Sequence, residues 1–404
     1  MNNLKIGILK EDKIPSDRRV VLTPIQASEV NKKDHISIFV EKSAVRTYSD
    51  EEYSSQGLKL TNDLGDCDIL LGVKEVPIAS LIPNKTYFFF SHTIKKQPHN
   101  RALLREILDK NIRIIDWECL TNSKGQRLIA FGRYAGIVGA YNGVLTYGKK
   151  TQRFSLRPAH TCHDLDDLKT EFYKVNLPPI KIVITGGGRV ANGAKEVLDG
   201  IGILQITPDA FLVNSYDHPV YTQLEVTDYN KRVNGDPFEM SDFFQNPEEF
   251  ESDFKKYTSA ANMLIGAAFW DPKAPVLFTQ KDAQRAEFMI DVIADITCDI
   301  NGSIPSTLKS TTIDVPVYDY NPKTGLEEPP LSGKNNITVM AVDNLPCELP
   351  RNASVDFGDD FISFILDPLT GDDPDEIIER ATIAKDGKLT SLYSYLQGYV
   401  DITE

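Results

Sequence analysis

The chain has 404 residues with 44 Lys and Arg against 58 Asp and Glu, so its formal net charge at pH 7 is −14. A surface this acidic repels phosphate backbones, which argues against a protein that binds nucleic acids or anionic membranes. Hydrophobic residues make up 41% of the chain, which is typical of a folded protein, and its length predicts two or three domains at roughly 150 residues each.

The first third of the sequence alternates short apolar runs with segments of helical character. This alternation is typical of an α/β layer with a largely parallel sheet. The predicted strands cover residues 4–9, 36–41, 67–74, 86–92 and 112–117, and the predicted helices cover residues 23–33 and 98–110.

A segment from Arg133 to Lys149 has the length of a helix but contains Gly136, Gly139 and Gly143. Steps of three and four residues place these glycines on one helical face, which indicates close packing against a neighbouring backbone. We interpret the segment as a helix that connects two domains. The stretch that follows, residues 151–179, is interpreted as a linker or a peripheral insertion.

A second α/β unit contains a glycine-rich turn between a predicted strand and a predicted helix. In KIVITGGGRVANGAKEVLDG, residues Gly186, Gly188 and Ala191 form a G-x-G-x-x-A pattern. The first glycine permits a tight turn, the second lets a pyrophosphate approach the backbone, and the small third residue lets helix and strand pack closely. The helix N-terminus, at Arg189 and Val190, supplies N–H groups for the phosphate. The pattern predicts a dinucleotide site, and a glycine-rich turn that binds nothing is the alternative.

The rest of the second unit and the tail follow the same alternation. The predicted strands are residues 181–185, 204–207, 263–267, 288–294 and 337–342, and helices are predicted over residues 192–199 and from residue 357 onward.

The residue that would bind the adenosine ribose is left open. A carboxylate roughly 20 residues after the glycine turn usually binds the ribose hydroxyls of NAD. Near that distance the predicted strand ends in Thr207, and Asp209 follows two residues later. With Thr207 at this position no carboxylate repels a 2′-phosphate, and Arg189 could supply positive charge for NADP. With Asp209 as the ribose ligand, NAD fits. The expected cofactor is therefore NAD or NADP.

Two titratable residues each close an apolar strand of the first unit, Lys74 in GVKE and His92 in FFFSH. Parallel strands direct their carboxyl ends toward the crevice in which α/β proteins bind ligands, so both side chains could converge there. A solvated lysine and an internally bonded histidine are the alternatives. Arg18 and Arg19 precede the first helix. They are either surface charges or residues that bind a carboxylate with two hydrogen bonds.

The segment from His160 to Asp167 has residue types that bind metals, including Cys162 and His163. Ligands this closely spaced suit no usual zinc geometry, so we interpret the segment as a solvated loop and expect no bound metal. The five cysteines lack paired spacing, and neither a signal peptide nor a membrane span is evident. These features favour a cytoplasmic protein with reduced thiols.

Several sequence blocks resemble the lysine–2-oxoglutarate reductase half of bifunctional aminoadipic semialdehyde synthase. They are DRRVVLTP, GVKEVP, YFFFSHTIKKQ, IRIIDWE and GQRLIAFGRYAG. The same blocks are similar to the NAD-dependent, lysine-forming saccharopine dehydrogenases and, more distantly, to alanine dehydrogenase. The resemblance resumes at ITGGGRVANGA, DVIADITCDINGSI and AVDNLPCELPRNAS, so it covers nearly the whole chain from Lys5 to about Pro368.

The resemblance implies roles for individual residues. In that family a Lys and a His are the acid–base groups at the reacting carbon, and these positions match Lys74 and His92. Relatives tend to carry Asp or Glu where this chain has Thr207, which leaves NAD preference open. The other positions that match are Arg19, Lys95, Gln97 and Phe131 for substrate, Asp295 beside the nicotinamide and the substrate, and Asp343, Asn344 and Leu345 at the rim between the domains.

The predicted fold class is α/β, with two Rossmann-like domains whose parallel-sheet cores flank a cleft. Residues 1–133 with 346–404 would form the substrate domain, and residues 134–345 the dinucleotide-binding domain. The resemblance implies an NAD(P)-dependent oxidoreductase that interconverts saccharopine with L-lysine and 2-oxoglutarate by imine formation and hydride transfer. The alternatives are an alanine dehydrogenase or another opine-type amino-acid dehydrogenase, and a non-catalytic nucleotide sensor. The expected partners are these small molecules, with neither nucleic acid nor membrane, and the oligomeric state is not predicted.

Overall fold

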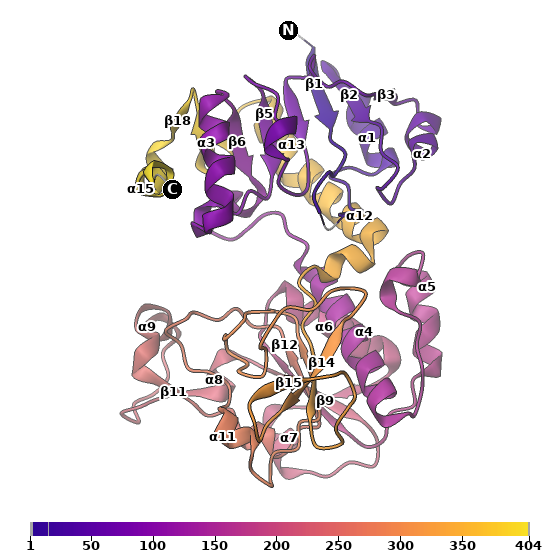
Figure 1. Cartoon of the computed structure of the whole chain (residues 1–404), viewed down its shortest axis with the longest axis vertical. Helices are drawn as coiled ribbons and strands as arrows, with labels where there is room; N and C mark the ends of the chain where they lie inside the picture. Colours follow the sequence, from indigo (N-terminus) through magenta and orange to yellow (C-terminus); the bar gives the residue numbers. More distant parts are fainter. Residues whose placement is uncertain (1–2, 15, 403–404) are drawn as a thin grey trace. The chain divides into compact units, whose positions relative to one another are not determined.

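The computed structural model describes residues 3–14 and 16–402, and the chain divides into two compact units. Unit 1 comprises Met1–Phe131 and Pro350–Glu404, and unit 2 comprises Gly132–Leu349. Each unit contains an eight-stranded, largely parallel sheet with helices packed around it (Figure 1). The predicted α/β class is therefore confirmed.

The sheet of unit 1 has the order β18-β17-β6-β5-β4-β1-β2-β3. Its six parallel strands are β1 (Leu4–Ile8), β2 (Ile36–Glu41), β3 (Lys59–Thr61), β4 (Ile69–Leu71), β5 (Thr86–Phe89) and β6 (Arg113–Asp116). The C-terminal segment adds β17 (Thr382–Lys385), which pairs antiparallel with β6, and β18 (Lys388–Leu389), which pairs antiparallel with β17 at the edge of the sheet. The expectation of an entirely helical tail is wrong for residues 382–389. The backbone of β17 forms its hydrogen bonds with the otherwise open edge of β6 instead of within a helix.

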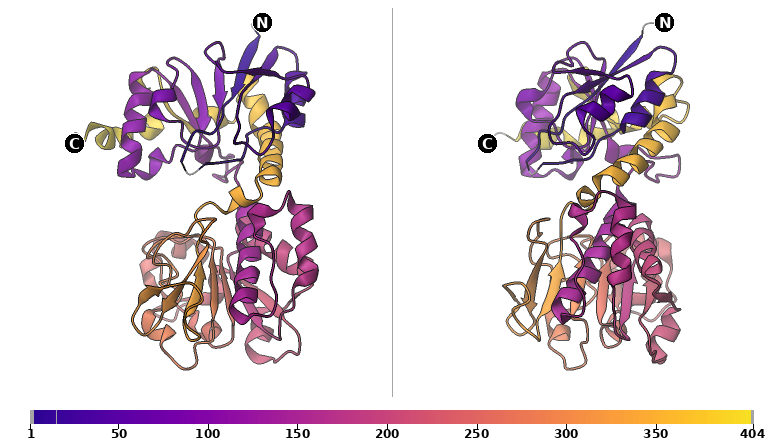
Figure 2. Two further views of the ribbon diagram at one scale, coloured as in Figure 1. Left: turned by 45° about the vertical axis from the view of Figure 1, so that its right-hand side comes forward. Right: turned by 90° about the vertical axis from the view of Figure 1, so that its right-hand side faces the viewer.

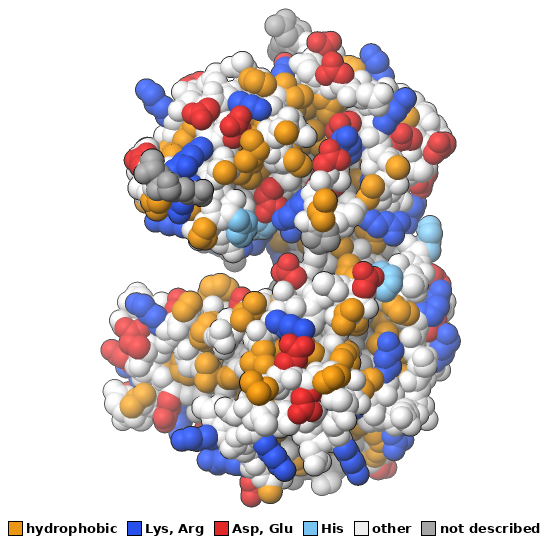
Figure 3. Space-filling view, in the orientation of Figure 1, with side chains coloured by type: hydrophobic (Ala, Val, Ile, Leu, Met, Phe, Trp, Pro, Cys, Tyr) orange, Lys and Arg blue, Asp and Glu red, His pale blue; other side chains and the backbone are white. Residues whose placement is uncertain are grey.

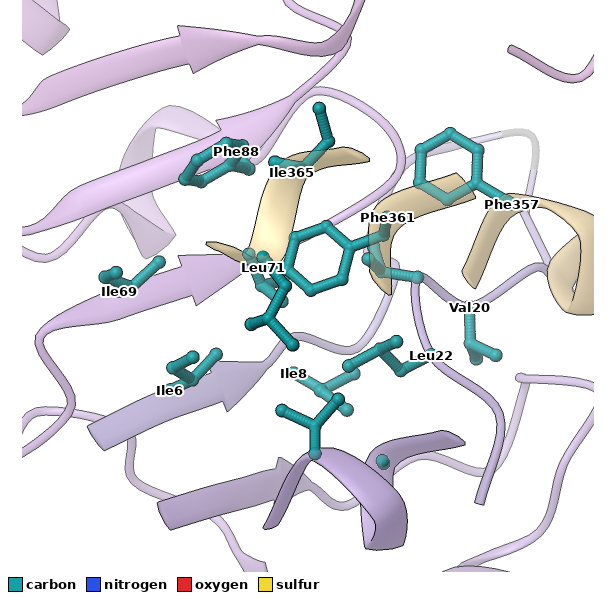
Figure 4. Close-up of a cluster of buried hydrophobic side chains, with 14 of the residues drawn as sticks. Ile6, Ile8, Val20, Leu22, Ile69, Leu71, Phe88, Phe357, Phe361 and Ile365 are labelled. Atoms are coloured by element: carbon teal, nitrogen blue, oxygen red, sulfur yellow. The ribbon is translucent and has the colours of Figure 1, made fainter. Parts of the chain in front are cut away.

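Helices cover this sheet and share its core. They are α1 (Pro24–Asn31), α2 (Asp50–Ser55), α3 (Arg101–Asp109), α12 (Pro350–Asp360), α13 (Leu366–Thr370), α14 (Ile377–Ala381) and α15 (Gln397–Asp401). Figure 4 shows Phe361 and Ile365 of the C-terminal segment beside the strand residues Leu71 and Phe88, and Phe357 belongs to the same buried cluster. The strands β4, β5 and β6 are buried along most of their length, which is why their sequences lack a polar face.

The sheet of unit 2 has the order β15-β14-β16-β13-β12-β7-β9-β8. The parallel strands are β7 (Lys181–Thr185), β8 (Leu204–Gln205), β9 (Val220–Leu224), β12 (Met263–Gly266), β13 (Val292–Asp295) and β16 (Ile337–Met340), and the antiparallel ones are β14 (Val317–Asn321) and β15 (Leu326–Glu328). A separate pair joins β10 (Asn230–Arg232) to β11 (Phe250–Ser252).

Strand β9 was not predicted from the sequence, and it changes the neighbourhood of the glycine turn. It lies between β7 and β8, so β8 is the edge strand of the sheet. The predicted strand over residues 204–207 is correspondingly too long. It ends at Gln205, and Thr207 instead caps the following helix, α7 (Pro208–Val213), by accepting a hydrogen bond from the Ala210 N–H at 3.3 Å.

The predicted glycine-faced helix is α4 (Gly132–Thr151). Gly136 packs against a neighbouring backbone as expected, whereas Gly139 and Gly143 pack against side chains. The helix lies against α6 (Arg189–Ile201) and against β13 and β16 (Figure 2). A Cβ atom at Gly136 would overlap with the carbonyl oxygen of Val190 and would lie 2.8 Å from the Ala194 nitrogen. The two helices therefore touch through their backbones.

Residues 151–179, expected to be a linker or an insertion, form part of unit 2. The segment contains α5 (Leu165–Lys169), and Leu168 and Phe172 are buried. The short helices that remain in unit 2 are α8 (Val226–Tyr229), α9 (Met240–Gln245), α10 (Lys255–Thr258) and α11 (Gln280–Ala283).

Candidate functional site

Lys74 and His92 lie at the carboxyl end of the unit 1 sheet. Each residue comes three positions after the end of a strand, Lys74 after β4 and His92 after β5, and these strands are neighbours. Ligands of open α/β sheets bind at this end of the strands. The placement on adjacent strands agrees with the expectation from the sequence.

His92 and Lys13 are joined by the carboxylate of Glu75. One carboxylate oxygen lies 2.5 Å from His92 Nδ1, and the other lies 2.5 Å from Lys13 Nζ. Burial would raise the pKa of Glu75, but the hydrogen bonds from His92 and Lys13 outweigh it and lower the pKa to about 2. Glu75 is therefore ionised at neutral pH, so Nδ1 carries the proton in this bond and Nε2 is left to exchange protons.

The backbone at His92 is in the left-handed region, with φ at +53°. A non-glycine residue rarely adopts this conformation, and such strain collects at functional sites. The preceding residue is held firmly, because the buried carboxylate of Asp116 accepts hydrogen bonds from the Ser91 N–H at 2.9 Å and from the Ser91 hydroxyl at 2.5 Å. The ring of His92 also stacks on Phe90, with 6.3 Å between the two ring centroids.

The ammonium group of Lys74 is partly desolvated and lies near charges of both signs. Burial lowers the pKa of Lys74, and the charge of Arg19 lowers it further, while Asp17 and Glu75 act in the opposite direction. A lysine with a lowered pKa has a larger neutral fraction near neutral pH and can accept a proton.

Arg19 is 3% exposed and binds Asp17 with two hydrogen bonds, of 3.1 Å from Nε and 2.6 Å from a terminal nitrogen. Its guanidinium lies 4.1 Å above the ring of Phe131, which in turn stacks on Phe357 at 4.4 Å. Arg19 is thus paired with a carboxylate of this chain, and its binding of a substrate carboxylate stays a prediction. Four of the predicted residues, Lys74, His92, Arg19 and Phe131, fall in one contiguous region.

Lys95 and Gln97 lie on the exposed loop that follows His92. Lys95 Nζ is 3.3 Å from a carboxylate oxygen of Glu118, and the carbonyl of Gln97 accepts a hydrogen bond from the Tyr399 hydroxyl. This loop is thus tied to the C-terminal segment of unit 1. The structure does not show Lys95 or Gln97 in contact with Lys74.

The glycine turn of unit 2 has the backbone that its sequence predicts. Gly186 has φ at +101°, and a Cβ there would lie 3.0 Å from the carbonyl oxygen of Ala267. Gly188 is the N-cap of α6, with open space where its side chain would be, and Arg189 is exposed in the first turn. An uncovered helix N-terminus behind a tight glycine turn fits a pyrophosphate.

The carboxylate nearest this turn is Glu225, which the sequence reading missed. It directly follows β9, the strand beside β7, and a Cβ at Gly187 would overlap with its carboxylate oxygens. The Gly186 N–H donates to the Leu224 carbonyl at 2.8 Å, which fixes the end of β9 against the turn. Thr207 and Asp209 belong to the start of α7, which follows the edge strand β8. The apolar alternation of VYTQLE was the signal that could have identified β9 and its terminal carboxylate.

An aromatic cavity of about 90 Å³ lies beside the same turn. Its lining residues include Thr185, the last residue of β7, and Val226, which follows Glu225. The aromatic side chains that line it are Tyr229, Phe243, Phe244, Phe269 and Trp270. An aromatic cavity next to a carboxylate and a glycine turn has the order of parts that an adenine, a ribose and a pyrophosphate require.

The remaining predicted positions of unit 2 are placed as follows. Asp295 is 1% exposed, and its carboxylate accepts hydrogen bonds from the hydroxyls of Thr297 and Thr307, both at 2.6 Å. Burial raises the pKa of Asp295. Asp343 is exposed and Asn344 is half-buried, whereas Leu345 is buried against the glycine face of α4.

Within the described ranges 3–14 and 16–402, no group of three or more His, Cys, Asp or Glu residues is arranged to hold a metal ion. His160 lies 3.7 Å from the buried carboxylate of Glu348, which raises the pKa of His160. Over the same part of the chain, no helix is long and apolar enough to cross a membrane. Figure 3 shows charged side chains scattered over the visible face of both units.

Comparison with family models gives two matches that together span most of the chain. Residues 7–138 match the alanine dehydrogenase/PNT N-terminal domain, and residues 170–392 match the alanine dehydrogenase/PNT C-terminal domain. The chain is also 30% identical to alpha-aminoadipic semialdehyde synthase of Arabidopsis thaliana, over 98% of this chain and 41% of the relative. It is 25% identical to a saccharopine dehydrogenase [NAD(+), L-lysine-forming] of Yarrowia lipolytica, over 90% of this chain and 92% of the relative.

The chain spans less than half the length of the aminoadipic semialdehyde synthases that it matches. Among solved structures, an L-alanine dehydrogenase superposes with a TM-score of 0.65 at 17% identity, covering 98% of this chain and 99% of that one. A transhydrogenase from Sinorhizobium meliloti superposes with a TM-score of 0.60 at 13% identity, covering 96% of this chain and 98% of that one. At these identities the two structures establish the fold.

Proposed function

We propose that this chain, which belongs to the alanine dehydrogenase/PNT family, is a nicotinamide-dinucleotide-dependent oxidoreductase that interconverts saccharopine with L-lysine and 2-oxoglutarate. The resemblance predicted from the sequence blocks is confirmed by the two domain matches and by the relatives. Relatives named as aminoadipic semialdehyde synthase and saccharopine dehydrogenase support the substrate class. The observation that carries the proposal is the bonded set of Lys13, Glu75 and His92 at one end of the unit 1 sheet, with Lys74 and Arg19 near enough to interact with each other electrostatically.

In the synthetic direction the ε-amine of lysine attacks the keto carbon of 2-oxoglutarate, and water leaves to form an imine. The amine must first lose a proton, and the departing hydroxyl must gain one. Lys74, with its lowered pKa, is suited to accept the proton from the substrate ammonium. His92 Nε2 is suited to return a proton to the departing oxygen, because Glu75 holds Nδ1 on the opposite side of the ring.

The substrates together carry three carboxylates, so the site needs positive charge within an acidic protein. Lys13, Arg19 and Lys95 supply it around Lys74 and His92. Arg19 and Lys95 are already paired with Asp17 and Glu118, so an incoming substrate carboxylate would share or displace these partners.

The glycine turn and Glu225 are the groups of this chain that would hold the dinucleotide, whose nicotinamide supplies the hydride that reduces the imine. We propose NAD rather than NADP. Glu225 could accept hydrogen bonds from both ribose hydroxyls, and its negative charge would repel a 2′-phosphate. The adenine would occupy the aromatic cavity beside Val226. Arg189 and Val190 remain the proposed phosphate-binding positions.

Glu225→Ser is expected to shift cofactor preference toward NADP. A hydrogen bond to a charged group contributes about 1.5–3 kcal/mol, so the ratio of kcat/KM for NADH over NADPH should fall by about tenfold or more. The matched control is Asp209→Asn, which also removes one negative charge, at the position that the spacing rule favours. It should leave the ratio within about twofold. A shifted ratio in Asp209→Asn, with none in Glu225→Ser, would place the ribose at Asp209.

The activity itself is tested with the purified protein and a panel of substrates. NADH or NADPH is mixed with 2-oxoglutarate or pyruvate and with lysine or ammonia, and oxidation is followed by nicotinamide absorbance. The expected result is turnover that requires both lysine and 2-oxoglutarate. Turnover of ammonia with pyruvate, and none with lysine, would identify an alanine dehydrogenase. Dinucleotide binding without turnover of any pair would identify a nucleotide sensor. The cytoplasmic location stays a prediction.

A further inference from the structure

Glu11 lies on the loop that follows β1 and reaches across to the end of β4. One of its carboxylate oxygens accepts a hydrogen bond from the Val73 N–H at 2.6 Å, and the other accepts one from the Lys74 N–H at 2.9 Å. Neither the residue nor these bonds have a part in the proton transfers described above. Both oxygens of one side chain are thus committed to the backbone of the segment that carries Lys74.

These two donors need Glu11 because the sheet has ended. The last backbone hydrogen bond between β1 and β4 runs from the Leu9 N–H to the Leu71 carbonyl at 2.9 Å. Beyond it the two segments are no longer paired as strands. On the other side, the Val73 carbonyl accepts a bond from the Phe90 N–H at 3.0 Å. The Val73 and Lys74 N–H groups would otherwise lack a strand partner, and a buried donor without an acceptor is costly.

We propose that Glu11 is a positioning residue for Lys74, holding residues 73–74 by two backbone hydrogen bonds so that the Lys74 amine stands where substrate protons are exchanged. The proposal rests on the proposed function for the role of Lys74. Glu11 itself is not a catalytic residue, since it acts through the backbone of Lys74. The hydrogen bonds are stronger when the carboxylate is ionised, so the hold depends on its charge.

The ionisation of Glu11 falls in an accessible pH range. Burial raises the pKa of Glu11 to about 8, the charge of Asp17 raises it as well, and the bonds from Val73 and Lys74 and the charge of Arg19 act against this. A cavity of about 210 Å³ lies beside the carboxylate. The charged groups facing this region are Lys10 and Asp12 on the same loop, Asp17 and Arg19 before α1, Glu41 at the end of β2, Asp63 after β3, and Lys74 and Glu75 after β4.

A single amide signal reports on this contact without any assay of activity. The dipeptide Val-Lys occurs once in the sequence, at residues 73–74. Labelling the full chain with carbonyl-13C valine and 15N lysine therefore gives one carbonyl-edited amide peak, that of Lys74. In the wild-type protein this peak should titrate with a midpoint near pH 8 as Glu11 ionises. In Glu11→Gln, which cannot ionise, that titration should be absent.

Glu41→Gln is the matched control. Glu41 also has a pKa raised by burial, and it also accepts a backbone hydrogen bond at a strand end, from the Lys10 N–H at 3.0 Å. This variant should keep the Lys74 titration. If Glu11→Gln fails to fold, Glu11→Asp keeps an acid but withdraws it by one methylene, and the midpoint should shift. A Lys74 peak that titrates unchanged in the Glu11 variant overturns the proposal.

Turnover gives a second measurement, which separates this proposal from the proposed function. The ratio of wild-type to Glu11→Gln kcat should be about tenfold at pH 9, where Glu11 is ionised, and smaller at pH 7. KM for the dinucleotide should not change, because its proposed site is in unit 2. Equal ratios at both pH values, or a loss confined to KM, would overturn the positioning role. A wild-type protein without turnover would refute the proposed function, while the amide titration would still test the Glu11 contact.

Discussion

Lys74→Met should lower turnover by about a hundredfold or more, because a positioned acid–base group contributes roughly 10²–10⁴-fold in rate. Methionine keeps the length and apolar stem of lysine but cannot accept a proton. Dinucleotide affinity should stay unchanged, since Lys74 belongs to unit 1 and the glycine turn belongs to unit 2. Steady-state turnover and a fluorescence titration with NADH measure the two effects separately.

Lys10→Met is the matched control for this prediction. Lys10 lines the same cavity as Lys74, but its ammonium pairs with Asp12 at 3.2 Å and with Glu41 at 3.9 Å. Exposed pairs of this kind contribute little, so turnover should change by less than about threefold. His92→Gln should resemble Lys74→Met, with turnover at least tenfold lower. Wild-type turnover in either active-site variant would remove that residue from the mechanism.

Gly136→Ala should lower the free energy of unfolding of unit 2 by about 2 kcal/mol. The new methyl group would overlap with the Val190 carbonyl, and backbone atoms cannot rotate away as a side chain can. Overpacking typically costs about 1–3 kcal/mol, and a backbone collision belongs at or above the upper end. The higher helix propensity of alanine returns about 1 kcal/mol. Denaturant unfolding of the variant and the wild type gives the difference.

Gly132→Ala, in the same helix, is the control, because its methyl group would meet the Arg189 Cβ at an ordinary 3.4 Å. Its effect should stay below about 0.5 kcal/mol. Gly136→Ala should also weaken dinucleotide binding, since Val190 lies in the first turn of α6, directly behind the glycine turn. Equal stability of the two variants would mean that α4 and α6 have room between them.

The sequence was most informative where function depends on local backbone. The tight turn at Gly186 and the close helix contact at Gly136 both require a residue without a side chain, and glycine is identified directly in a sequence. Strand ends were also predictable, because an apolar run followed by Lys74 or His92 marks both the strand and its carboxyl end. These features follow from neighbours along the chain.

Contacts between distant segments were not predictable in the same way. Glu225 lies beside the glycine turn because β9 inserts between β7 and β8, and strand order is a property of the whole sheet. Residues 382–389 were expected to be helical but form a hairpin. This strand pairing could not be predicted, because the partner strand β6 lies more than two hundred residues earlier. Glu11 and Glu75 drew no attention, since an acidic residue in a polar loop is ordinarily solvated.

The way the chain divides has a consequence for its synthesis. The first segment of unit 1 precedes unit 2 along the chain, whereas Phe357, Phe361 and β17 are synthesised only after all of unit 2. During translation the nascent N-terminal segment therefore exposes an incomplete core and a bare edge at β6, both of which invite aggregation. Unit 2 is contiguous and can fold first. The segment that carries Lys74 and His92 is translated before unit 2 but completes its fold after unit 2 has been synthesised.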